Sequence, residues 1–310
     1  MSAQRLVRRM REVLSDGGLT GSFLIRDLRT GEEIGIDPDV TYPIASLVKV
    51  PLAVAVLTRL EDGRLDGATL VELAPGRAAS TGQTGVTRFR HPAFIAVDDL
   101  LYLSVAISDN AAADALFDLV GPAEVNQAMR EVDVTGISVR HPLVDLVSTP
   151  AERMAPDEVH LAQALAIGAG TPGRGHVVPQ LDVSRANVGT ARALVDLLAA
   201  VWTPSRIPAG VAARIRALMG GNLVRHRLAP DFASDASTWS SKTGTLLNLR
   251  HEVGVVEHDD GGRYAVAAMT ESRVPAAIQP AAEALTGRVA RALHDWLRGQ
   301  ADVGSTGGSA

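Results

Sequence analysis

Segments with strand character lie near both ends of this 310-residue chain, and helical segments fill its middle. Strands are expected at Ser22–Asp27, Glu32–Ile36, Thr238–Lys242, His251–Glu257 and Tyr264–Met269. The first two flank the turn Arg29–Gly31 and predict a β-hairpin. An antiparallel sheet built from the two ends, flanked by terminal helices and carrying an inserted all-helical lobe, satisfies this order. The predicted fold class is therefore α+β.

Helical periodicity accounts for most of the remaining chain. Helices are expected from the N-terminus to about Ser15, from Ser46 onward, and at Val97–Ser104, Ala111–Leu119, Ala123–Val132, Ala151–Ile167, Thr190–Trp202, Gly210–Met219 and Ala276–Leu297. The helix after Ser46 is apolar nearly all round, which is typical of a buried helix. A long loop is predicted over 168–187. The expected division is an α/β lobe of residues 1–40 and 203–300, a helical lobe of 41–202 and a disordered tail of 301–310.

Composition narrows the possible functions. The chain is 46% hydrophobic and 21% charged, with a net charge of −5, so we expect a soluble protein that binds neither nucleic acid nor an anionic membrane. It has no cysteine, which excludes disulfides, thiolate metal sites and cysteine nucleophiles. The N-terminal segment lacks the apolar stretch of roughly 7–15 residues that a secretory signal needs. We therefore expect a cytoplasmic location.

Three short motifs carry chemical information: Ser46–Lys49 (S-L-V-K), Ser108–Asn110 (S-D-N) and Lys242–Gly244 (K-T-G). A serine hydroxyl is a poor nucleophile and needs a nearby base. Residues three apart share one face of a helix, so Lys49 can place its amine beside the Ser46 oxygen. Burial and cationic neighbours can lower a lysine pKa until part of the population is neutral and basic. The first motif therefore indicates an activated serine.

Taken together and in this order, the three motifs resemble the signature of class A β-lactamases and penicillin-binding proteins. The resemblance extends from the Gly21 hairpin to the C-terminal helix. It implies the β-lactamase/transpeptidase-like fold and a covalent acyl-Ser46 intermediate, formed without a metal or cofactor. In such a site two backbone N–H groups stabilise the oxyanion. The resemblance assigns these to Ser46 and to Thr245, the residue after K-T-G.

The resemblance also implies roles for the other motif residues. Ser108 would pass a proton to the leaving group, and Asn110 would bind the amide side chain of the substrate, while Asp109 holds its own loop. Lys242 and Thr243 would bind a substrate carboxylate and polarise Ser108. Gly244 would let the strand edge lie close to the substrate. Arg250 follows at about the place where the family often carries an arginine that supports the carboxylate pocket, and a solvated strand arginine is the equal alternative.

The chain departs from class A β-lactamases at the residue that activates the deacylating water. The family places a glutamate on a loop between S-D-N and K-T-G, and the matching position falls near Arg174. No glutamate occurs from Val159 to His251, and Asp182 is the one carboxylate of the loop. Other carboxylates, Asp145, Glu152 and Glu158, lie earlier in the chain. This departure leaves acylation possible and predicts slow hydrolysis of the acyl-enzyme, with Lys49 as the acylation base.

Several other polar or aromatic residues lie near the motifs in the sequence. His226 and Arg227 precede the K-T-G strand and could reach the rim of the carboxylate pocket, but a structural role is favoured for both. His251 and His258 have no partners at metal-ligand spacing and are expected at the surface. Trp239 is expected in the core.

The predicted function is that of a serine hydrolase acting on β-lactam, ester or amide substrates, with weak β-lactam turnover. One alternative is an esterase or transacylase of small-molecule metabolism. Another is an acyl-binding or sensing module that does not release its acyl group. The expected partner is a small-molecule acyl donor that carries a carboxylate or an amide. The sequence leaves the oligomeric state open.

Overall fold

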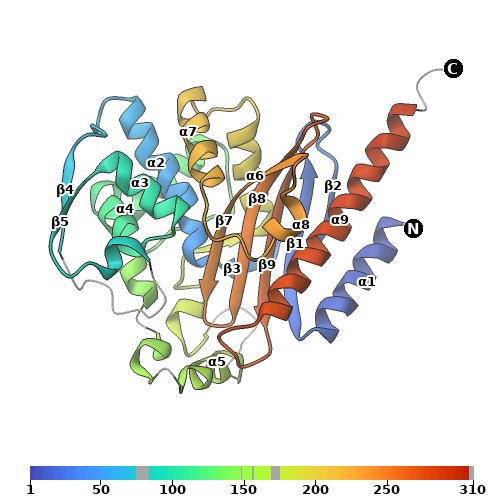
Figure 1. The fold of residues 1–310 in the computed structure, drawn as a ribbon, viewed down its shortest axis with the longest axis horizontal. Helices are drawn as coiled ribbons and strands as arrows, with labels where there is room; N and C mark the ends of the chain where they lie inside the picture. The colour runs from blue at the N-terminus through green and yellow to red at the C-terminus, as the bar shows by residue number, and fades with distance from the viewer. Residues whose placement is uncertain (75–83, 148, 156, 169–174, 307–310) are drawn as a thin grey trace.

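The computed structural model describes residues 1–74, 84–147, 149–155, 157–168 and 175–306. Within them a five-stranded antiparallel sheet has the order β2-β1-β9-β8-β7 (Figure 1). Its strands are β1 (Leu19–Asp27), β2 (Glu33–Ile36), β7 (Ser237–Leu246), β8 (Leu249–His258) and β9 (Arg263–Ser272). These are the five strands expected from the sequence. Phe23 of β1 lies opposite Ala268 of β9, so the two ends of the chain form one sheet, as predicted.

Two small antiparallel pairs accompany this sheet and were not predicted. Strand β3 (Thr41–Pro43) pairs with β6 (Val188–Thr190), and β4 (Leu70–Leu73) pairs with β5 (Ala93–Ala96). Strands of three or four residues show too little alternation to be recognised in a sequence. The β3–β6 pair matters for function because β3 leads directly into the segment that carries Ser46.

The two terminal helices, α1 (Ala3–Asp16) and α9 (Pro280–Thr306), lie side by side against one face of the sheet (Figure 1). Their apolar stripes, which include Leu6, Leu14 and Leu293, bury against the inward side chains of β1, β8 and β9. Helix α9 continues to Thr306, and the disorder expected for the tail 301–310 stays a prediction. The last four residues lie outside the described part of the chain.

The other face of the sheet is covered by the larger apolar core. The remaining helices are α2 (Lys49–Glu61), α3 (Val97–Ala106), α4 (Asn110–Glu131), α5 (Val159–Gly168), α6 (Ala191–Trp202), α7 (Ala209–Gly220) and α8 (Ala229–Phe232), with single 3-10 turns η1 (Ala45–Val48), η2 (Gly85–Arg88), η3 (Leu143–Val147), η4 (Pro150–Arg153) and η5 (Pro179–Leu181). Helix α6 packs against β1, β8 and β9. The division into two lobes stays a prediction, and α6 contacts the sheet although that division placed it in the helical lobe.

Two of the helical segments are interrupted. Helix α4 contains a break at Gly121, whose backbone (φ 69°) is not helical, just before Pro122. This break lies between the two helices expected at Ala111–Leu119 and Ala123–Val132, as predicted. In the segment expected to be helical over Ala151–Ile167, the chain first forms the turn η4, and α5 begins at Val159.

The expectation that His251 and His258 lie at the surface is wrong. His251 is fully buried; its Nε2 lies 3.0 Å from the Pro43 carbonyl oxygen, and its Nδ1 accepts the Thr270 N–H at 3.2 Å. These contacts require a neutral ring protonated on Nε2. His258 is half-buried, with its Nε2 3.1 Å from that of His294. Trp239 is in the core as expected, stacked on Phe232.

The buried His251 makes stability sensitive to acid. Burial lowers the pKa of His251 from 6.5 to about 4. The unfolded chain therefore binds a proton that the folded protein excludes, so the free energy of unfolding should fall as the pH drops from 6.5 toward 4. The expected loss from this group is about 2 kcal/mol at pH 5. Urea unfolding at pH 7.5 and pH 5 measures it, and His251→Gln should lose less stability over that interval. Equal losses in the two proteins would contradict this.

Candidate active site

The predicted nucleophile, Ser46, lies in a turn between strand β3 and helix α2. Strand β3 ends at Pro43, and Ser46 is the second residue of η1, immediately before α2 begins at Lys49. Ala45 adopts φ 48°, a region that non-glycine residues rarely occupy and that is common at functional sites. Ser46 is partly exposed, while its neighbours Ala45 and Leu47 are buried. The local backbone thus presents the serine hydroxyl at the surface of an otherwise apolar segment.

Lys49 is fully buried and surrounded by oxygen acceptors. Its Nζ donates to Asn110 Oδ1 at 2.6 Å and to the Ser108 carbonyl at 2.7 Å. Ser108 Oγ and Ser46 Oγ lie at 3.2 and 3.3 Å. A neutral amine has two N–H donors and one lone pair. With its protons on the two shortest contacts, that lone pair is left for the hydroxyl of Ser46.

The environment favours this neutral form near physiological pH. Burial lowers the pKa of Lys49 from 10.5 to about 7, against the opposing attraction of Asp109 and Asp114. Since desolvation disfavours the charged form of any group, it acts on the ammonium here. A lysine with this pKa can exchange a proton with the adjacent serine, which is the property that a general base requires.

The S-D-N motif lies between α3 and α4, and each of its residues has a separate task. Asp109 is buried and caps α4, accepting the Ala111 N–H at 2.9 Å. It also accepts from Thr87 Oγ1 at 2.6 Å and from the N–H of Val86. The expectation that Asp109 holds its loop agrees with these contacts. Ser108 adopts φ 61°, which turns its side chain and its carbonyl toward Lys49.

The K-T-G motif lies within the edge strand β7 rather than at its end. Lys242 is fully buried, and its Nζ donates to Ser108 Oγ at 2.9 Å and to the Thr243 carbonyl at 3.0 Å. Ser108 Oγ therefore lies between the two lysine amines. Burial first, and then the positive charges of Lys49 and Arg227, hold the pKa of Lys242 well below its usual value. The three motifs thus meet at one place.

Gly244 allows strand β7 to approach the turn η1 closely. A Cβ at this position would lie 2.8 Å from the Ile44 carbonyl oxygen and 3.0 Å from Leu47 Cγ. Such distances are too short for ordinary packing, so glycine is required for β7 to lie against η1. The predicted reason, close approach of the strand edge to the substrate, stays a prediction. The observed reason is that Gly244 fixes the Ser46 turn against the sheet.

Arg250 lies under the β7–β8 turn. Its guanidinium donates to the carbonyls of Leu247, Leu249 and Ala277, and its Nε is 3.6 Å from Glu283 Oε1. These contacts account for its burial, so a structural role is favoured over a substrate role, which stays a prediction. Thr245 is exposed beside it at the strand edge.

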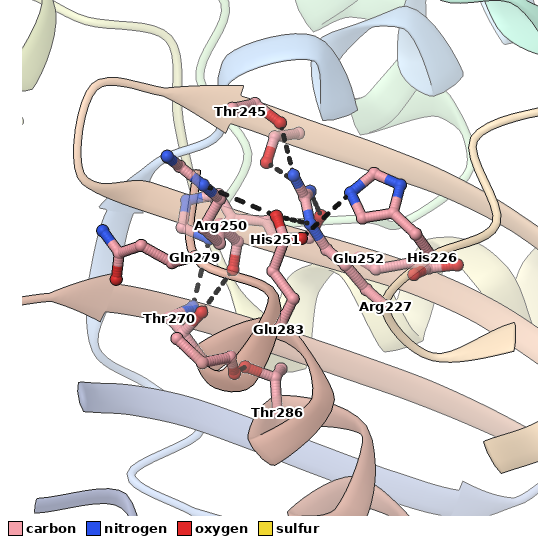
Figure 2. A network of polar contacts seen from close by, with 12 residues as sticks. His226, Arg227, Thr245, Arg250, His251, Glu252, Thr270, Gln279, Glu283 and Thr286 are labelled. Carbon is pink, nitrogen blue, oxygen red and sulfur yellow. Dashed lines mark hydrogen bonds and ion pairs between the residues drawn. The ribbon is translucent and has the colours of Figure 1, made fainter. Parts of the chain in front are cut away.

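Arg227, for which a structural role was favoured, lies next to the site, as its position in the sequence allowed. It is 2% exposed, and it bonds to β7 and β8 near the K-T-G motif and to Glu283 of α9 (Figure 2). His226, which is half exposed, contacts the second oxygen of the same glutamate at 3.3 Å. The network links the start of α9 to the edge of the sheet.

The structure offers no evident substitute, among the residues it describes, for the glutamate that the sequence lacks. Asp182 is occupied within its own loop, where it accepts from Gly175 N at 3.1 Å, Ser184 N at 2.8 Å and Ser184 Oγ at 2.7 Å. The hydrogen bonds from Ser184 lower the pKa of Asp182. Arg174 and the side chain of Glu152 lie outside the described residues, and Glu158 bonds to a nearby backbone N–H.

Asp114 is a site residue that sequence reasoning missed. It lies one helical turn after Asn110 in α4 and accepts the backbone N–H groups of Leu143 at 2.6 Å and Val144 at 3.1 Å. Burial raises the pKa of Asp114 to about 6, against the opposing effect of these bonds and of Lys49. Asp114 follows Asn110 by four residues, so the two side chains share one face of the helix. This spacing is the feature of the sequence from which Asp114 could have been predicted to lie near the site.

Known proteins share this sequence and fold. The model of the Beta-lactamase enzyme family matches residues 5–297, and the chain belongs to that family. It is 61% identical to the Beta-lactamase regulatory protein BlaB of Streptomyces cacaoi, over 96% of this chain and 99% of the relative.

Solved structures agree in fold at low identity. A mutant of PBP-A, solved as an acyl-enzyme complex with penicillin G, has a TM-score of 0.74 at 19% identity, covering 95% of this chain and 97% of that one. A β-lactamase from Sphaerobacter thermophilus has a TM-score of 0.73 at 21% identity, covering 93% and 95%. The predicted β-lactamase/transpeptidase-like fold is therefore confirmed.

The described part of the chain offers neither a cluster of metal-binding side chains nor a membrane-spanning helix. Its residues contain no group of three or more side chains suited to hold a metal ion. No helix among them has the length and apolar character needed to cross a membrane.

The contact made by Gly244 leads to a prediction about the turn. Gly244→Ala places a methyl group against the Ile44 carbonyl, so β7 and η1 must separate by several tenths of an ångström. We expect a loss of about 1–3 kcal/mol in the free energy of unfolding, as for overpacked cores. Chemical denaturation measures this. Gly299→Ala, where a Cβ meets nothing within 4 Å and φ is not positive, is the control for the loss of a glycine without a close contact. An unchanged stability in Gly244→Ala would show that the close contact is unimportant.

Proposed function

We propose that this protein is acylated on Ser46 by β-lactams or related acyl donors, and that it retains the acyl group long enough to act in sensing or regulation. The observation that carries the proposal is the buried Lys49 amine, 3.3 Å from Ser46 Oγ, with a pKa of about 7. Membership of the Beta-lactamase enzyme family supports a serine hydrolase site. The regulatory name of the 61% identical relative supports a sensing role.

In the proposed acylation, neutral Lys49 takes the proton of Ser46 as Oγ attacks the carbonyl carbon of the acyl donor. The N–H groups of Ser46 and Thr245 receive the developing oxyanion. Ser108, between the two lysines, transfers a proton to the departing nitrogen or oxygen and regains one from Lys49. The balance is one ester formed, one amide or ester broken, and one proton moved from Ser46 to the leaving group.

Substrate binding uses the groups that remain. Asn110 Oδ1 accepts from Lys49, which leaves the Asn110 amide N–H groups for a carbonyl of the acyl donor. Thr243 and Lys242 would hold a carboxylate at the edge of β7. A carboxylate bound there would raise the pKa of Lys242, because an opposite charge favours the protonated amine.

Slow release of the acyl group is expected from the contacts of the available carboxylates. Asp182 is occupied by Gly175 and Ser184, and Asp114 by the N–H groups of Leu143 and Val144. An esterase or transacylase, in which a small alcohol or amine takes the acyl group, is the second candidate, because Lys49 can activate either nucleophile.

The role of Lys49 leads to a prediction about pH. As the pH falls below 7, Lys49 becomes protonated, so the acylation rate should drop about tenfold per unit. Lys49→Ala should acylate about 10²–10⁴-fold more slowly at pH 8 and lose this inflection. Stopped-flow acylation with nitrocefin, with circular dichroism to verify folding, measures both. A Lys49→Ala rate within about tenfold of wild type, a difference worth about 1.4 kcal/mol, would assign the base elsewhere.

The lifetime of the acyl-enzyme provides the main test of the proposal. Nitrocefin should give a burst of about one equivalent followed by a low steady rate, while a p-nitrophenyl ester turns over faster. Intact mass should show a penicillin adduct on wild type and none on Ser46→Ala. Asp182→Asn should leave the steady rate unchanged. Fast nitrocefin turnover without a burst would mean that this chain activates water efficiently, and an adduct on Ser46→Ala would exclude Ser46 as the nucleophile.

A further inference from the structure

Arg227 contacts the peptide group that precedes Thr245. Its Nη1 donates to the Gly244 carbonyl at 3.1 Å and to the His251 carbonyl at 2.8 Å, and its Nη2 donates to Thr245 Oγ1 at 2.6 Å. Figure 2 shows the guanidinium next to Thr245 and above the start of α9. The Gly244 carbonyl and the Thr245 N–H belong to one peptide group. Any force on the carbonyl therefore acts on that N–H.

The geometry sets the direction of this N–H. The same Nη1 bonds to carbonyls of β7 and β8, so the Gly244 carbonyl lies on the β8 side of its strand. The described residues contain no cis peptide, and in a trans peptide the N–H and the C=O point in opposite directions. Because β7 is an edge strand, the Thr245 N–H points toward the open edge. The turn η1, which carries Ser46, packs against this strand.

The charge of Arg227 strengthens this donor. A guanidinium remains protonated in proteins, and at 2% exposure it is little screened by water. A hydrogen bond from a cation to a carbonyl draws electron density from the amide, so the N–H at the other end becomes a better donor. Glu283 Oε1, 3.2 Å from Arg227 Nε, compensates the charge and fixes the plane of the guanidinium.

We propose that Arg227 is a positioning residue for acylation, which orients and polarises the Gly244–Thr245 peptide so that its N–H stabilises the oxyanion. The inference rests on the proposed acylation of Ser46 and deepens it. Arg250, although also buried, bonds to Leu247, Leu249 and Ala277 and not to this peptide. A lysine at position 227 would keep the charge but lose the planar fork that reaches Gly244, His251 and Thr245 together.

The test combines rate with a signal from the ester itself. Arg227→Lys and Arg227→Gln are acylated with a penicillin, and the infrared stretch of the acyl-Ser46 carbonyl is recorded. We expect acylation to slow by about 10–100-fold, since loss of a complete oxyanion donor costs about 10²–10³-fold. The carbonyl stretch should move to higher wavenumber, because weaker hydrogen bonding leaves more double-bond character. Arg216→Lys, whose guanidinium bonds to the Val201 carbonyl away from the site, should change neither.

The outcomes are separable. Wild type that forms no adduct by intact mass overturns the proposed function, and this inference with it. Folded Arg227 variants that acylate within about twofold of wild type, with an unchanged carbonyl stretch, overturn only the role of Arg227. Should neither variant fold, Glu283→Gln removes the charge that fixes the plane of the Arg227 guanidinium and so loosens its contact with the Gly244 carbonyl. A shift to higher wavenumber then supports the role, and an unshifted stretch overturns it.

Discussion

Burial of the Lys49 amine is the constraint on which the rest of the site depends. An ammonium group removed from water is costly unless oxygen atoms surround it. Asn110 and Ser108 supply those oxygens from the start of α4, 59–61 residues along the chain. The S-D-N turn must therefore lie against α2, and Ser108 must adopt its positive φ for its carbonyl to reach Nζ. The hydrogen bonds of Lys49 therefore fix the positions of Ser108 and Asn110 in the protein without a substrate.

The second organising feature is the concentration of cations along β7. Burial, and then the positive charges of Lys49 and Arg227, lower the pKa of Lys242, while burial lowers that of Lys49. Lysine can lose its proton to relieve repulsion, whereas arginine stays charged and must be paired. Arg227 is accordingly paired with Glu283, and both lysines have lowered pKa values. One cluster thus contains amines that can transfer protons and a guanidinium that holds the strand.

The site was predictable from the sequence where short motifs carry it, and not where long-range contacts do. The motifs at Ser46, Ser108 and Lys242 predicted that three segments of the chain form one site. The structure brings these segments together. Nothing in the sequence indicated that His251 would bond to Pro43, 208 positions away. The strand patterns predicted a sheet built from both ends of the chain, but its strand order required the structure, and the three-residue strands β3 and β6 carry no periodicity to detect. Gly244 was noticed as part of a motif, while its contact with Ile44 required the fold.

Family membership supports a serine hydrolase site and leaves open the fate of the acyl group. In the proposed acylation, activation depends on Lys49 and its oxygen neighbours, which lie within hydrogen-bond distance of one another. Hydrolysis depends on a base that holds water beside the ester, and the carboxylate of Asp182 is occupied by its own loop. A receptor and an enzyme can therefore share the same fold and the same nucleophile, and differ only in that base. Retention of the acyl group then requires no additional residues, because an ester persists when water attacks it slowly.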